Sequence, residues 1–99
     1  MSPMYLLSLD KYELGCLIMC LNGTTFIEEE RNQTKNNCLL RVIDIYDNMT
    51  TKQKKAIDLT DKEHTLAIEC LALTSSFCIK REEMKYVDEI SNVIHKLNG

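Results

Sequence analysis

The feature that most constrains this 99-residue chain is an internal repeat with a period of about fifty residues. Apolar positions and polar positions recur together at this offset, in the pairs Leu9/Leu59, Glu13/Glu63, Ile18/Ile68, Cys20/Cys70, Leu21/Leu71, Thr24/Thr74 and Thr25/Ser75. Further along, the offset becomes 51, as in Phe26/Phe77, Leu39/Ile90, Val42/Val93 and Ile43/Ile94. We expect the extra residue to fall between two elements, where an insertion costs little. The chain is therefore interpreted as two copies of one unit.

Each copy carries signals for the start and the end of helices. A good N-cap residue is followed three residues later by glutamate, the spacing of a capping box, in Asp10/Glu13 and Thr60/Glu63. Asn48 and Gly99 stand at matching places at the end of each copy, and both residue types tolerate the left-handed conformation of a C-cap. A single proline and three glycines leave long stretches free to be helical.

These signals predict an all-α fold in which two tandem helical hairpins form a four-helix bundle. The chain is expected to be one domain, with hairpin 1 at about 9–48, a linker at 49–58 and hairpin 2 at about 59–99. The expected helices are 10–30, 34–47, 60–79 and 82–97. Within the linker, residues 51–56 are expected to make one extra helical turn.

The two copies differ in how much apolar surface they present. The last helix has one apolar stripe, Val87, Ile90, Ile94 and Leu97, whereas both helices of the first copy are apolar on most sides. This surplus has two interpretations: the N-terminal segment around residues 5–7 folds over it, or it docks a partner. A homodimer would use the same surface. The candidate partner-binding residues are Met19, Leu40 and Ile45.

The charge pattern argues against nucleic acid as the main partner. The net charge is −3, and the one basic cluster is Lys52, Lys54 and Lys55 in the linker. This cluster is interpreted as a solvated linker or as an electrostatic contact to an acidic partner surface. The longest apolar run, Leu14 to Leu21, is too short for a membrane span. The N-terminal apolar residues do not read as an export signal, because charged residues interrupt them and no basic region precedes them. We therefore expect a cytoplasmic protein without a membrane association.

No residue pattern points to metal, cofactor or catalysis. The five cysteines, Cys16, Cys20, Cys38, Cys70 and Cys78, include no CxxC pair and are expected to be reduced, buried and apolar in behaviour. The two histidines carry no local signature of a nucleophile and base, and there is no glycine-rich phosphate loop. The sequence predicts a protein that is not an enzyme, with no catalytic, cofactor-binding or metal-binding residues.

The opening Leu-[Asp/Thr]-x-x-Glu, the leucine-rich helix, the polar turn and the second amphipathic helix resemble small helical accessory proteins of bacteriophages and other mobile elements. The resemblance covers both hairpins and implies a non-enzymatic protein–protein interaction module. Such a module would be a stoichiometric inhibitor of a host protein or defence complex, acting in the host cytoplasm. The alternative is a small transcriptional or nucleic-acid-binding regulator, which predicts salt-sensitive retention on DNA that depends on Lys52, Lys54 and Lys55.

Overall fold

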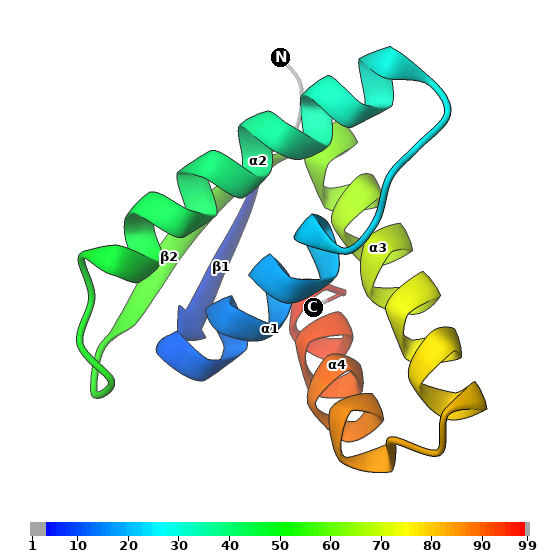
Figure 1. Cartoon of the computed structure of the whole chain (residues 1–99). Coiled ribbons are helices and arrows are strands. Elements are labelled where there is room, and N and C mark those ends of the chain that lie inside the picture. Colours follow the sequence, from blue (N-terminus) through cyan, green and yellow to red (C-terminus); the bar gives the residue numbers. More distant parts are fainter. Residues whose placement is uncertain (1–3, 99) are drawn as a thin grey trace.

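The computed structural model describes the backbone of residues 4–98 and their side chains, except at positions 4–7, 55 and 56. Four helices pack against one another and confirm the all-α fold: α1 (Lys11–Asn22), α2 (Glu29–Asp47), α3 (Asp61–Lys80) and α4 (Met84–Leu97) (Figure 1). The described chain also holds two short strands, β1 (Met4–Asp10) and β2 (Lys54–Thr60), which the sequence did not predict. Each copy of the repeat therefore runs strand, helix, helix.

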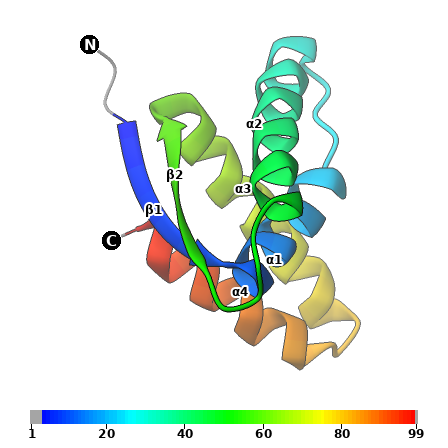
Figure 2. The ribbon, with the colours of Figure 1, turned by 90° about the vertical axis from the view of Figure 1, so that its left-hand side faces the viewer.

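The two strands form an antiparallel pair at one side of the molecule, with the helices on the other side (Figure 2). Leu9, Ile57 and Leu59 are buried while Ser8 and Asp58 are exposed, which is the alternation expected of strands with one face on a core. The expected helical turn at 51–56 is wrong, because the chain from Lys54 onward pairs with β1. The backbone of residues 5–7 lies in β1, but their side chains are outside the described part of the structure.

The contacts between the copies follow an approximate twofold axis. In the sheet, Leu7 lies opposite Ile57, which is its own counterpart fifty residues on. Arg41 of α2 binds Glu63 at the start of α3. Asn92 of α4, the counterpart of Arg41, binds Glu13 at the start of α1 with an Nδ2–Oε2 distance of 2.8 Å. The second helix of each copy thus contacts the capping glutamate of the other copy.

Both predicted capping boxes are confirmed. The Asp10 side chain accepts a hydrogen bond from the Glu13 N–H at 2.8 Å, and the Glu13 carboxylate accepts one from the Asp10 N–H at 2.9 Å. Thr60 and Glu63 make the same pair of bonds, at 3.1 and 3.0 Å. Asn48 is the C-cap of α2 as predicted, although its φ of −101° is not left-handed, and Gly99 lies outside the described residues.

The first connection was placed wrongly by the sequence, because α1 ends at Asn22 and α2 begins at Glu29. The segment between them is held by side chains of its own neighbourhood. The hydroxyl of Thr24 donates to the carbonyl of Cys20 at 3.0 Å, and the Phe26 N–H donates to the Asn32 Oδ1 at 2.8 Å. These two bonds satisfy the Cys20 carbonyl and the Phe26 N–H, which in a continued helix would bond to other backbone groups.

The extra residue of the second copy does not fall between two elements. Ser75 matches Thr25 and Phe77 matches Phe26, so the unmatched residue is Ser76, which lies inside α3. Because Asn22 corresponds to Ala72, α3 continues to Lys80 well past the place where α1 ends. The longer α3 is the main departure from twofold symmetry.

The extended α3 ends in a tight turn at Glu82. The Glu83 N–H donates to the Cys78 carbonyl at 2.9 Å and the Glu82 N–H to the Ile79 carbonyl at 3.0 Å, the pattern of a Schellman motif. Glu82 has a φ of 59°, in the left-handed region that normally favours glycine at this position.

We therefore expect Glu82→Gly to raise the free energy of unfolding by about 0.5 to 1 kcal/mol, since glycine adopts this φ without a Cβ clash. Urea unfolding followed by circular dichroism measures the change. Glu82→Ala is the control, because it removes the carboxylate and keeps the Cβ, and it should bring no such gain. A loss of stability in the glycine variant would contradict strain at this residue.

Candidate functional site

The structure separates the apolar residues that the sequence nominated for partner binding. Met19 lies on α1 and is 42% exposed, and Leu40 lies on α2 and is 66% exposed. Ile45, also on α2, is partly buried against the core. Met19 lines the groove described below, whereas Leu40 and Ile45 are not part of its lining. The proposed role of Leu40 and Ile45 stays a prediction.

The basic candidates follow the C-terminal end of α2. Lys52 is exposed in the turn between α2 and β2, and Lys54 is exposed at the first position of β2. The side chain of Lys55 is outside the described part of the structure. Neither Lys52 nor Lys54 lines the groove.

All five cysteines are buried and unbridged, as the sequence predicted. A hydrogen bond between the two thiols lowers the pKa of Cys16 and raises that of Cys20. Burial raises the pKa of Cys38 to about 12 and also raises that of Cys70. These thiols lie in the core, where a cysteine behaves as a small apolar group.

The histidines and acids do not gather into a site. The Nε2 of buried His64 lies 2.7 Å from the carbonyl oxygen of Leu97, and His95 is exposed on α4. Among the described residues, no three His, Cys, Asp or Glu side chains are grouped so that they would hold a metal ion. Nor does any helix in this part of the chain combine the length and apolar character needed to cross a membrane.

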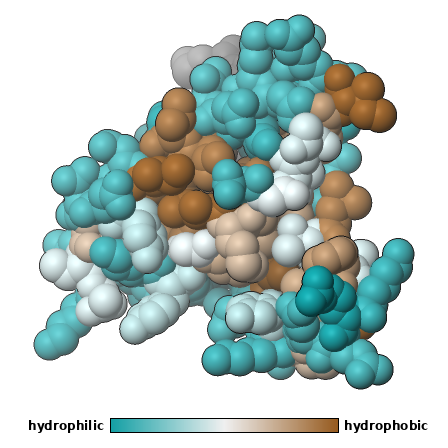
Figure 3. All heavy atoms as spheres, in the orientation of Figure 1, coloured by the Kyte–Doolittle hydropathy of each residue, from teal (hydrophilic) through white to brown (hydrophobic). Residues whose placement is uncertain are grey.

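A groove of about 630 Å³ lies between the end of α1, the second half of α3 and the start of α4. Four large apolar side chains on its walls stay about half exposed: Met19 at 42%, Leu73 at 52%, Phe77 at 57% and Tyr86 at 43%. Weakly polar and apolar residues occupy the middle of this face between hydrophilic areas (Figure 3). The groove is lined by Met19, Gly23, Thr24, Thr25, Leu73, Thr74, Phe77, Cys78, Glu83 and Tyr86.

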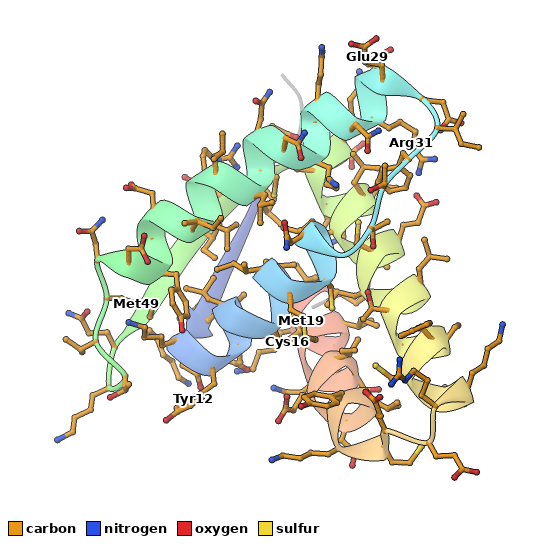
Figure 4. All side chains as sticks on the ribbon, viewed as in Figure 1. Tyr12, Cys16, Met19, Glu29, Arg31 and Met49 are labelled. Atoms are coloured by element: carbon orange, nitrogen blue, oxygen red, sulfur yellow. The ribbon has the colours of Figure 1, made fainter. Side chains whose placement is uncertain are left out.

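The helices place these side chains through their spacing. Leu73 and Phe77 are four residues apart on α3 and therefore share one face of the helix. Met19 lies on the side of α1 that faces α3 and α4, while Tyr12 lies at the far end of α1 (Figure 4). At the rim, the Arg81 guanidinium lies 5.5 Å from the centre of the Phe77 ring, and its Nε lies 2.9 Å from the Glu83 carboxylate.

The lining of the groove is mainly apolar and weakly polar. Its described lining includes one carboxylate, Glu83, and no histidine or lysine that would act as a base toward a nucleophile. Thr24 and Thr74 donate their hydroxyl protons to the backbone carbonyls of Cys20 and Cys70. A ligand here would be held by burial of its apolar surface and by a small number of polar contacts at the rim.

Sequence reasoning missed Leu73, Phe77 and Tyr86, because it looked for surplus apolar surface in the first copy. A signal was present in the second copy, since residues 66–79 carry apolar side chains on more than one face of the helix. Comparison of the chain with protein-family models, with curated proteins and with solved structures finds no match.

Proposed function

We propose that this protein is a non-enzymatic protein–protein interaction module whose docking site is the groove at the end of α3. The observation that supports the proposal is the exposure of Leu73, Phe77 and Tyr86 on the walls of one apolar hollow. Scattered apolar residues on a surface are ordinary, but a group around a hollow is typical of a binding site. The resemblance to phage accessory proteins suggests a stoichiometric inhibitor of a host protein or defence complex in the host cytoplasm.

The size of the exposed surface favours a protein over a small ligand. Full burial of a large apolar side chain yields about 1.5 to 3 kcal/mol, so four half-exposed side chains contribute roughly 4 kcal/mol. A dissociation constant near 1 μM requires about 8 kcal/mol. The partner must therefore extend past the groove, where Met84 at the start of α4 is 53% exposed.

The test is a pair of matched charge insertions on α3. Leu73 and Ile79 are both 52% exposed, but only Leu73 lines the groove. We expect Leu73→Glu to weaken binding of the partner captured from a lysate of the source cells at least about tenfold, or 1.4 kcal/mol, because it places a charge in the apolar contact. Ile79→Glu should keep most of the affinity.

Two results would contradict the proposal. One is a partner whose affinity is unchanged by Leu73→Glu, which would place the docking surface elsewhere. The other is a dimer in light scattering of the purified protein that Leu73→Glu converts to a monomer. In that case a second copy of the chain would cover the groove, and the role as an inhibitor of another protein would be wrong.

A further inference from the structure

The twofold counterpart of the groove is a closed corner in the first copy. There the Lys35 ammonium donates to the Thr24 carbonyl, and the Asn32 side chain bonds both the N–H and the carbonyl of Phe26. Phe26 is only 8% exposed and Lys35 only 6%. The Arg31 guanidinium lies 4.1 Å from the centre of the Phe26 ring. An aromatic side chain on a non-helical segment thus fills this corner.

Arg31 also ties the corner to the other copy through an ion pair with Glu69 of α3. Each of the residues that build the corner has a counterpart in the second half of the repeat or, for Glu69, in the first. Five of these counterparts line the groove, in the pairs Thr24/Thr74, Phe26/Phe77, Asn32/Glu83, Lys35/Tyr86 and Glu69/Met19, whereas Glu82, the counterpart of Arg31, does not. The groove is therefore the same corner of the fold, left open in the second copy.

The longer α3 explains why the second corner is open. In the first copy the chain leaves α1 at Asn22 and turns back, so that Phe26 folds inward. In the second copy the same stretch is still helical, and Phe77 is 57% exposed on the wall rather than buried in the corner. Residues 74–77, the counterparts of 24–26, continue along α3 and do not turn back as the first copy does.

We infer that the groove receives from a partner what Phe26 supplies within the chain: an aromatic side chain carried on a short non-helical segment. This inference rests on the proposed function and names the chemistry of the partner. We expect an aromatic rather than an aliphatic side chain, because Met19 has in the groove the place that Glu69 has in the closed corner. A thioether makes favourable contacts with an aromatic ring, and the loss of the carboxylate removes the need for an adjacent cation.

The polar residues of the closed corner also have counterparts that suit a peptide backbone. The Asn32 side chain accepts a hydrogen bond from the Phe26 N–H. Glu83 has the equivalent place in the groove, and its carboxylate is also an acceptor. Lys35 donates to the carbonyl of Thr24, and the Tyr86 hydroxyl in its place is a donor. The bound segment would thus give the N–H of its aromatic residue to Glu83 and the carbonyl of the residue two positions earlier to Tyr86.

The experiment selects a library of random short peptides, displayed on yeast, for binding to the full chain. We expect the selected peptides to share Phe, Tyr or Trp at one fixed position. For the best peptide, replacement of that aromatic residue by alanine should weaken binding at least about tenfold in calorimetry, and Leu73→Glu in the protein should have an equal effect. Tyr86→Phe should weaken binding a few-fold through loss of the hydroxyl, while Ile79→Glu should leave it unchanged.

Selected peptides without a shared aromatic residue, or peptides whose binding survives Leu73→Glu, would overturn the inference. A library that yields no binder would do the same. These results are separable from failure of the proposed function. If Leu73→Glu still abolishes capture of the lysate partner, the groove is a docking site and only its aromatic preference is wrong. If capture of that partner survives Leu73→Glu, the proposed docking site itself is wrong.

Discussion

Replacement of Leu71 by alanine is expected to lower the free energy of unfolding by about 3 kcal/mol, and replacement of Leu21 by a similar amount. Both side chains are fully buried, and they occupy the same place in the two copies, on α1 and α3. Each substitution removes buried methyl groups and leaves a cavity that the packed helices fill only in part. For a domain of this size, whose total stability is of the order of 10 kcal/mol, such a loss is large.

Urea unfolding of each variant measures these losses. Leu73→Ala is the matched control, because Leu73 lies two residues after Leu71 on the same helix but is half exposed, and its loss should stay below about 1 kcal/mol. If Leu71→Ala were costly and Leu21→Ala nearly neutral, the two copies would not share one core. That result would contradict the twofold arrangement of the packing.

The sequence was sufficient to predict where two of the helices begin and that two similar units exist. Both starts depend on local chemistry: Asp10 and Thr60 cap helices whose third residue returns the bond, and three or four residues suffice to recognise this. The burial of Cys20 and Cys70 follows from their recurrence at one position of the repeat. Local capping signals and repeated positions were therefore sufficient to predict most of the helical fold.

The strands could not be predicted in the same way, because a strand is stabilised by a partner that is distant in the sequence. Residues 51–56 read Thr-Lys-Gln-Lys-Lys-Ala, which has little preference for strands. Residues 5–7 are consecutive apolar residues without the alternation typical of a half-buried strand. The antiparallel pairing, with Leu7 opposite Ile57, is what makes residues 54–56 and 5–7 extended.

The groove was missed for a different reason: it lies where the two copies differ. We expected the extra residue of the second copy to fall between two elements, whereas Ser76 lies within α3. The same stretch that folds inward around Phe26 stays helical around Phe77, and the two phenylalanines differ widely in exposure. A comparison of the copies that looked for differences as well as matches would have pointed to residues 73–86.

The second large effect is expected at Glu63, one of the two capping glutamates that bind the other copy. Glu63→Gln should lower the free energy of unfolding by about 2 kcal/mol at neutral pH, since hydrogen bonds to charged groups contribute about 1.5 to 3 kcal/mol. The Glu63 carboxylate is buried and accepts two bonds from the Arg41 guanidinium, at 2.5 and 2.9 Å. Glutamine still fits a capping box, so this substitution tests the charge more than the cap.

The free energy of unfolding lost in Glu63→Gln should depend on pH. Burial by itself raises the pKa of Glu63, but the bonds from Arg41 and from the Thr60 N–H outweigh it, so the folded-state pKa lies below the ordinary value of 4.5. A group with a lowered folded pKa stabilises the fold above its unfolded pKa, and this contribution disappears as the pH falls through the folded pKa. The difference between wild type and Glu63→Gln should therefore be full at neutral pH and shrink below about pH 4.5.

Urea unfolding between neutral pH and strong acid measures this difference. Glu83→Gln is the control, because its ion pair with Arg81 is more exposed and should contribute at most about 1 kcal/mol. A gap between wild type and Glu63→Gln that stays constant into strong acid would mean that the carboxylate acts through packing and not through its charge. The contact between Arg41 and Glu63 would then not be what fixes α2 to the start of α3.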